Sequence, residues 1–129
     1  MHKRQINPWT WQDQFGFSQC WRVDSPSAVL FLAGQGPASA DGELVGAGDF
    51  EAQARQVFAN LATVLEQAGA SLESVVRLVV YLTDMANLRA YERIVSELIP
   101  GPKPVGTAIG VRSLAVEEML IEIEATAVV

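Results

Sequence analysis

The sequence predicts an α+β fold with the element order β-β-α-β-α-β-β, in which two helices lie on one face of one mixed sheet. Two observations carry this prediction. Two segments have apolar residues at helical spacing, and five short runs around them are apolar, β-branched or alternating in polarity. The 129 residues contain no Ser/Gly linker, repeat or low-complexity tract, and this length fits one domain over residues 1–129.

The first two strands are predicted at residues 17–23 and 28–33. The turn-forming sequence Asp24-Ser25-Pro26-Ser27 separates them, and Gly34-Gln35-Gly36-Pro37 ends the second strand. Asp41-Gly42 then predicts a tight turn ahead of the first helix. The second strand, AVLFLA, is apolar on both of its faces.

The two helices are predicted between recognisable start and stop signals. The first begins after Asp49, which suits an N-cap, and ends at Gly69. Its apolar positions are Phe50, Ala54, Val57, Phe58, Leu61, Val64, Leu65 and Ala68. The second is predicted over residues 85–99, before Pro100-Gly101-Pro102. Its apolar positions are Leu88, Tyr91, Ile94, Val95 and Leu98.

Three further strands are predicted at residues 75–82, 105–111 and 119–128. In the first of them, Arg77 lies opposite an apolar face that consists of Val76, Leu78, Val80 and Leu82. The last strand has one apolar face, formed by Met119, Ile121, Ile123, Ala125 and Ala127. Its other face carries Leu120, Glu122, Glu124, Thr126 and Val128.

The second face of the sheet predicts an oligomer. Two helices can cover only one face, yet the strand at residues 28–33 is apolar on both, and a buried strand needs cover on both sides. Only 19% of residues are charged, which is lean for the surface of a small monomer. A partner subunit on the second face would account for both features.

Composition excludes several classes of protein. Half of the residues are apolar and the mean hydropathy is +0.20, which excludes a disordered chain. Nine Lys and Arg against fifteen Asp and Glu give a net charge of −6, which argues against a nucleic-acid partner. No apolar run approaches the ~20 residues of a membrane span. The start of the sequence has no apolar core of a signal peptide, so a cytoplasmic location is expected.

The single cysteine and the single histidine limit the chemistry. Cys20 and His2 cannot build a Cys/His metal site or an internal disulfide, and we expect neither a metal nor a cofactor. Cys20 is interpreted as a small, partly buried hydrophobic residue rather than a reactive thiol. His2 lies at a terminus expected to fray, which argues against a Ser-His-Asp or Cys-His site.

From Phe17 onwards the chain resembles the Rid family (reactive intermediate/imine deaminase, also called YjgF or L-PSP). The motifs that carry the resemblance are Gly16-Phe17-Ser18-Gln19, Ala33-Gly34-Gln35, Glu51-Ala52-Gln53-Ala54-Arg55-Gln56, Asn60, Pro104, Ile109, Leu114 and Ile121-Glu122-Ile123-Glu124-Ala125. The resemblance implies a chorismate-mutase-like (YjgF) fold. It also implies a homotrimer with small-molecule ligands in the clefts between subunits.

At three family positions this sequence differs from the pattern. Members with deaminase activity are similar in using an arginine two residues after the proline to bind the carboxylate of a 2-imino or 2-enamino acid, by bidentate pairing. Here that position is Gly106. The family asparagine of the second helix falls at Glu92, and the cleft tyrosine is Phe17. Without a cation, a cleft that contains Glu122 would repel an anionic imino acid.

The resemblance assigns Glu122 as the catalytic carboxylate that positions the hydrolytic water, although Glu122 and Glu124 could equally form a structural pair at an interface. The substrate-binding candidates are Phe17, Gly34, Gln35, Gly106, Thr107, Ala108 and Glu92. Gly106 indicates either an enlarged pocket or close approach between subunits. Phe17 suits either a pocket wall or the core, and Arg77 suits either the interface or an ion pair with Glu122 or Glu124.

The sequence therefore supports two functions. The first is a Rid-type hydrolytic deaminase that acts on a small imine, an enamine or a related reactive metabolite. Gly106 argues that this metabolite is not the family's standard 2-aminoacrylate. The alternative is a non-catalytic trimer that binds a small metabolite or has a stress or chaperone-like role. Ribonuclease activity, which the family's older naming suggests, is disfavoured by the net charge.

Overall fold

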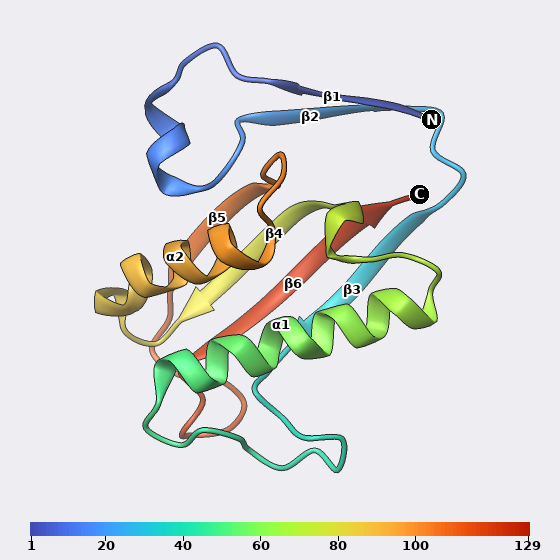
Figure 1. Cartoon of the computed structure of the whole chain (residues 1–129). Helices are drawn as coiled ribbons and strands as arrows, with labels where there is room; N and C mark the ends of the chain where they lie inside the picture. Colours follow the sequence, from blue (N-terminus) through green and yellow to red (C-terminus); the bar gives the residue numbers. More distant parts are fainter.

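The computed structural model describes all residues, 1–129, as a four-stranded sheet with two helices on one face and a separate N-terminal hairpin (Figure 1). The strands of the main sheet are β3 (Val29–Gln35), β4 (Val75–Leu82), β5 (Val105–Gly110) and β6 (Ile121–Val128). Their spatial order is β3-β6-β4-β5. β4 and β5 are parallel and the other pairs are antiparallel, so the predicted mixed sheet is confirmed.

The helices α1 (Phe50–Gln67) and α2 (Leu88–Leu98) follow the predicted amphipathic segments. Asp49 caps α1, since its carboxylate accepts a hydrogen bond from the Ala52 amide at 3.0 Å. A short 3₁₀ turn, Met85–Asn87, occupies the start of the second predicted helix and is capped by the Asp84 side chain. Neither these helices nor the short turns are long and apolar enough to cross a membrane.

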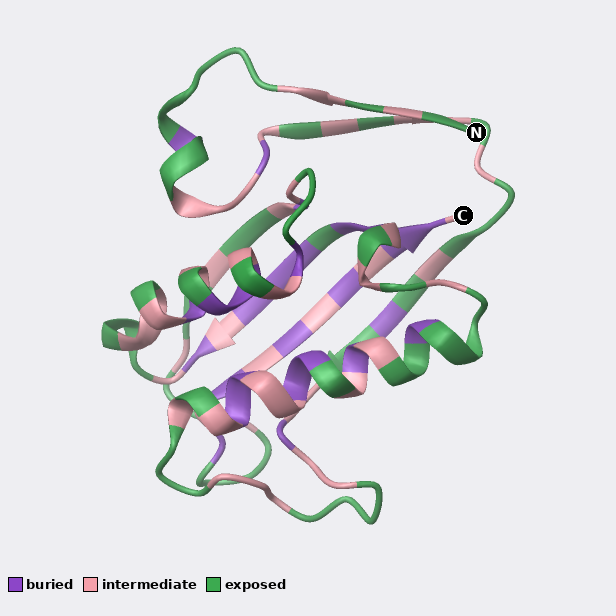
Figure 2. Ribbon diagram, viewed as in Figure 1, coloured by how far each residue is buried: buried purple, intermediate pink, exposed green.

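The core lies between the helices and one face of the sheet. The alternation of buried and half-buried residues along β6 follows the predicted period of two (Figure 2). The buried face of β6 packs with Leu78, Val80 and Leu82 of β4 against the two helices. Phe58 of α1 and Tyr91 of α2 stack at 6.3 Å, which ties the two helices together over this core.

The opposite face of the sheet has no cover within the protomer. Phe31 of β3 is 84% exposed there, and Val29 and Ile109 are exposed as well. This face also carries Glu122 and Glu124 of β6 and Tyr81 of β4. Each of these residues alternates along its strand with residues that point into the core, and Tyr81 is the register partner of Glu122. We refer to it below as the open face. Its apolar strand β3 is the feature from which the sequence predicted an oligomer.

The N-terminal region differs from the prediction. The strand expected at residues 17–23 is shorter, as β2 (Cys20–Asp24), and pairs antiparallel with an unpredicted strand, β1 (His2–Ile6). Only a single bridge, between Ser18 and Val105, links this segment to the main sheet. β1 has the polar sequence HKRQI, so no apolar alternation marked it. The expectation that His2 frays is therefore wrong, because His2 pairs with Asp24 in the hairpin. The prediction that Cys20 is partly buried is also wrong, because Cys20 is exposed.

Two polar residues of the Rid-like motif in α1 have structural roles. The Gln53 side chain is fully buried and donates to the carbonyls of Gly46 and Glu118. Its oxygen accepts from the Leu120 amide at 2.8 Å, so this one side chain joins the loop before α1 to the start of β6.

Asn60 fixes the chain just after β3. Its amide group donates to the carbonyls of Gly36 and Ala38 at 3.0 and 2.9 Å. Because Gly34 and Gln35 directly precede this loop, α1 determines where the end of β3 lies.

Candidate functional site

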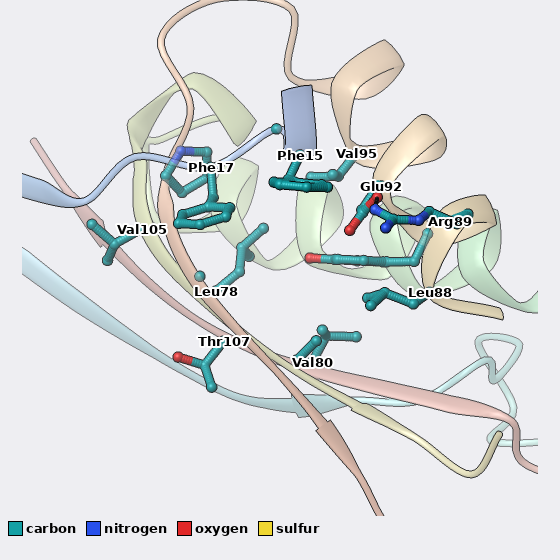
Figure 3. Close-up of a pocket in the computed structure, with 15 residues that line it drawn as sticks. Phe15, Phe17, Leu78, Val80, Leu88, Arg89, Glu92, Val95, Val105 and Thr107 are labelled. Atoms are coloured by element: carbon teal, nitrogen blue, oxygen red, sulfur yellow. Dashed lines mark hydrogen bonds and ion pairs between the residues drawn. The ribbon is translucent and has the colours of Figure 1, made fainter. Parts of the chain in front are cut away.

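An apolar cavity of about 280 Å³ lies between α2 and the β4–β5 edge of the sheet, under the segment that connects β1 to β2 in the N-terminal hairpin (Figure 3). Leu78 and Val80 of β4 form its floor, and Leu88 and Val95 of α2 form one side. The strand segment 104–108 closes the edge. The predominance of apolar side chains suits a small ligand with an apolar body.

Aromatic side chains from the segment between β1 and β2 form another wall of the cavity. Phe15 and Phe17 line the cavity directly. Trp11 contacts both from outside, with ring centroids at 6.5 Å from Phe15 and 5.8 Å from Phe17. Tyr91 lies at the back of the cavity, where burial raises the pKa of its phenol and keeps it protonated. Phe17 is thus a wall residue rather than only a core residue.

One ion pair stands at the cavity, on α2. Arg89 and Glu92 are three residues apart, and Arg89 Nη1 lies 2.7 Å from Glu92 Oε2. The Arg89 guanidinium also lies over the Phe15 ring, 4.9 Å from its centroid. No cation was expected at this cavity, because Gly106 occupies the family's arginine position. The spacing of Arg89 and Glu92 on one helix face was the signal that could have found it.

Gly106 leaves space in the cavity wall. Its register partner is Leu78, so both belong to the face of the sheet that carries the helices. A Cβ atom at Gly106 would lie 3.8 Å from the Leu78 carbonyl oxygen and 3.9 Å from Phe17 Cβ, which are ordinary contacts. By contrast, a Cβ at Gly110 would lie only 3.0 Å from Met85 Cγ. Within the protomer, Gly106 therefore borders open cavity space, whereas Gly110 lies in close contact with Met85.

Glu122 lies elsewhere, on the open face near the end of β3. Gly34 makes room for it, since a Cβ at that position would collide with the Glu122 carboxylate. Gln35 pairs in register with Ile123, and its side chain donates to the Ala33 carbonyl at 3.3 Å. The candidates Glu122, Gly34 and Gln35 therefore form one group.

The other predicted residues form a second group around the cavity: Phe17, Glu92, Gly106, Thr107 and Ala108. Phe17, Glu92, Gly106 and Ala108 lie under α2, on the side of the sheet away from Glu122. Thr107 borders the cavity from β5, but it is the register partner of Val79, which pairs with Glu124, so its side chain belongs to the open face. The structure thus brings the candidates together as two half-sites, separated by the sheet. A single protomer does not bring the Glu122 carboxylate to the apolar cavity.

The strand arginine singled out from the sequence lies next to the cavity. Arg77 is exposed, and it lines a smaller cavity of about 170 Å³ with Ser18, Gln19 and part of β5. It forms no ion pair with Glu122 or Glu124 within the protomer. Glu124 instead accepts a hydrogen bond from the Tyr81 hydroxyl at 3.2 Å. Desolvation, and then this carboxylate, raise the pKa of Tyr81.

Arg55 of the Rid-like motif in α1 connects the two helices. It pairs with Glu51 of α1 at 3.1 Å and with Glu97 of α2 at 2.7 Å. It lines neither of the two cavities described above. No group of three or more His, Cys, Asp or Glu side chains is placed to hold a metal ion.

The fold is that of a small α+β protein with an apolar cavity beneath its second helix. The chain belongs to the Rid family, also called YjgF or L-PSP. The family model described as Endoribonuclease L-PSP matches residues 15–129, which confirms the resemblance seen in the sequence.

Individual relatives agree with this family. A RutC family protein of Pyrococcus abyssi is 39% identical over 112 residues, which cover 86% of this chain and 84% of that protein. The mitochondrial protein mmf1 of Schizosaccharomyces pombe is 34% identical over 103 residues, or 78% of this chain and 62% of that one. The crystal structure of the conserved Rid-family protein YyfB of Yersinia pestis, whose function is unknown, superposes with a TM-score of 0.90 at 43% identity. That match covers 100% of both chains and so includes the N-terminal hairpin.

Proposed function

We propose that the chain is a hydrolytic deaminase of the imine/enamine type, acting on a small reactive metabolite with an apolar body. The observation that carries the proposal is the aromatic-walled cavity of about 280 Å³, in which Gly106 contributes no side chain. Its lining offers contact area to an apolar body and little charge to bind a small polar one.

The proposed active site forms between copies of the chain, in a homotrimer. The two half-sites lie on opposite sides of one sheet, and the open face displays Phe31 at 84% exposure. If the β5 edge of one protomer packs on the open face of the next, Glu122 of one copy can approach the cavity of another. A head-to-tail contact of this kind closes into a ring and buries the apolar strand β3.

The proposed chemistry is addition of water to a carbon–nitrogen double bond. Glu122 takes a proton from the water while the water oxygen bonds to the imine carbon. The imine nitrogen accepts a proton, which gives a carbinolamine. Cleavage of the carbon–nitrogen bond then releases ammonia and leaves a carbonyl product. Water supplies the oxygen and the protons, so no redox partner is needed.

The substrate is not the standard 2-aminoacrylate. Position 106, where the resemblance places the carboxylate-binding arginine, has no side chain. The Arg89 charge at the cavity is balanced by Glu92 at 2.7 Å. A very small anionic substrate therefore finds neither a free cation nor close packing there.

The second candidate is a non-catalytic protein that binds a small metabolite in the same cavity. The Arg89–Glu92 pair favours it, because the charged groups at this cavity bind each other rather than serving as a free acid or base. RNA cleavage is not proposed: the net charge is −6, and the cavity is predominantly apolar.

Ammonia release from a panel of enzymatically generated imines and enamines tests the proposal. The panel should run from 2-aminoacrylate to imines of amino acids with large apolar side chains. We expect turnover that rises with apolar size and falls at least about a hundredfold in Glu122→Gln, a loss within the usual range for acid–base groups. Glu124→Gln is the matched control from the same face of β6, and it should retain turnover.

Two results would decide against catalysis. Release at background across the whole panel, with a ligand still bound in the cavity, would support the non-catalytic candidate. Equal activity in wild type and Glu122→Gln would show that Glu122 takes no part in the reaction.

A further inference from the structure

The chain between β1 and β2 folds into a self-contained loop over the apolar cavity. This loop, called the aromatic loop below, covers residues 7–19, and its ends meet because the backbone N–H of Gln19 donates to Asn7 Oδ1 at 2.8 Å. Inside it, the fully buried Gln12 side chain donates to the Trp9 carbonyl at 2.8 Å. Joined ends and internal side-chain packing are the properties of a compact Ω-loop.

The aromatic loop is fixed to the rest of the protomer at the end that leads into β2. The Ser18 backbone N–H donates to the Pro104 carbonyl at 2.9 Å, and the Ser18 hydroxyl donates to the Lys103 carbonyl. Gly16 has a φ of +74° and lies directly against α2, where a Cβ atom would be 2.6 Å from Ser96 Oγ. The loop therefore holds its side chains at defined positions over the cavity.

Three aromatic side chains of this loop form one cluster. Trp11 meets the rings of Phe15 and Phe17 edge-on, with interplanar angles of 62° and 69°. The Arg89 guanidinium lies over the Phe15 ring at 4.9 Å and holds it from a second direction. Trp11 is 52% exposed and does not line the cavity, whereas both phenylalanines do. Trp11 thus orients two lining rings from outside the cavity.

The cavity offers a ligand two different surfaces. Its floor is aliphatic, and the two phenyl rings face Leu78 and Val80 across it (Figure 3). Phe15 and Phe17 are only half-buried in the protomer, so part of each ring is free for a ligand. An aliphatic surface takes up any apolar group in proportion to its area. Oriented aromatic rings add edge-to-face and offset-stacked contacts that only another aromatic ring can make.

We propose that this cavity recognises an aromatic ring and that Trp11 is the positioning residue that makes the recognition selective. The ring of the ligand lies between the aliphatic floor and the rings of Phe15 and Phe17. Recognition requires no charge on the ligand, because Arg89 is already paired with Glu92. The inference rests on the proposed deaminase function and names its substrate class as imines and enamines that carry an aromatic group.

A matched pair of stable, uncharged ketones tests the inference without any turnover. 1-Phenylpropan-2-one carries an aromatic ring, and 1-cyclohexylpropan-2-one carries a saturated ring that is at least as apolar. Calorimetric titration of both ketones should compare the wild-type oligomer with Trp11→Leu, which removes the support of the two rings, and with Trp11→Phe, which keeps an aromatic side chain. Trp9→Leu is the control, because Trp9 stacks on Trp11 and lies outside the cavity lining.

We expect the wild type to bind the phenyl ketone about two- to tenfold more tightly than the cyclohexyl ketone, as for an aromatic pair. Burial of apolar area alone would make the cyclohexyl ketone the equal or the better ligand. Trp11→Leu should remove the preference by weakening the phenyl ketone alone. Trp11→Phe should keep part of the preference, and Trp9→Leu should keep it in full.

Several results would overturn the inference. These are failure of the wild type to bind either ketone, equal or tighter binding of the cyclohexyl ketone, an equal loss of both ketones in Trp11→Leu, and loss of the preference in Trp9→Leu. The proposed catalysis fails separately. A phenyl preference that depends on Trp11 without hydrolysis of any imine would leave the aromatic site in place and exclude the deaminase. Imine hydrolysis without a phenyl preference would do the reverse.

Discussion

Arg89 and Glu92 form an ion pair of 2.7 Å at the mouth of the apolar cavity, one helical turn apart on α2. The Glu92 side chain is 17% exposed, whereas that of Arg89 is 71% exposed and lies over Phe15. The more buried partner is thus the carboxylate. It keeps the adjoining guanidinium from acting as a free anion-binding group.

Replacing Glu92 should release this cation. We expect Glu92→Gln to increase the affinity for phenylpyruvate by a few-fold, a small change because exposed ion pairs are weak. Affinity for 1-phenylpropan-2-one, a ketone with a similar apolar body and no carboxylate, should not change. Glu97→Gln, which removes the partner of Arg55 away from the cavity, is the control for calorimetry. Unchanged phenylpyruvate affinity in Glu92→Gln would show that Arg89 does not face the ligand.

An arginine introduced at position 106 should shift the substrate preference towards small acids. The Cβ fits without collision, and the side chain would extend into the open cavity. We expect Gly106→Arg to raise kcat/KM for 2-aminoacrylate by about tenfold or more, through charge-assisted pairing with the carboxylate. It should lower kcat/KM for large apolar imines, because it fills their space. Wild-type activity on 2-aminoacrylate equal to that of Gly106→Arg would contradict this account of the position.

The main sheet and both helices were predictable because their signals are local. Residues 75–82 are a continuous β-branched run and form β4 with these bounds, and Asp49 caps α1 as its position indicated. The strand β1 could not be predicted in this way. HKRQI carries no apolar alternation, and it becomes a strand because β2 offers it an antiparallel partner.

Parts of the site were beyond sequence reasoning for a related reason. A candidate list drawn from a family pattern does not say on which side of a sheet each residue lies. Glu122 and Gly106 belong to one such list, yet register places them on opposite faces. The Arg89–Glu92 pair, and the place of Arg77 beside Ser18 and Gln19, depend on contacts between distant segments.

Gln53 should be among the most important polar residues for stability. Its buried side chain makes three hydrogen bonds to the backbone of two loops. Gln53→Ala leaves those backbone groups without partners, which we expect to lower the free energy of unfolding by about 2–4 kcal/mol. Urea denaturation measures it, with the exposed Gln67→Ala of the same helix as control. A loss no larger than that of the control would contradict the role of Gln53.

The ion pairs between α1 and α2 predict a dependence of stability on pH. Hydrogen bonds from Arg93 and then Arg55 lower the pKa of Glu51 from its ordinary 4.5. A lowered folded-state pKa contributes stability above the unfolded-state pKa, and this contribution is lost as the pH falls through the folded-state value. Glu51→Gln should therefore lower Tm at pH 7 and have a vanishing effect in acid. A difference in Tm between wild type and Glu51→Gln that stays constant with pH would refute this prediction. Added salt should reduce the difference.

The central claim is that Glu122 of one copy acts on a ligand in the cavity of another. Co-expressed Glu122→Gln and Gly106→Phe chains, carrying different tags, should each be inactive alone, the second because the cavity is filled. Trimers purified through both tags contain one site with neither substitution. Ammonia release from the imine that the wild type hydrolyses fastest should then recover to about one third of the wild-type rate, as expected for a closed head-to-tail ring. Mixed trimers as inactive as either parent would contradict the claim.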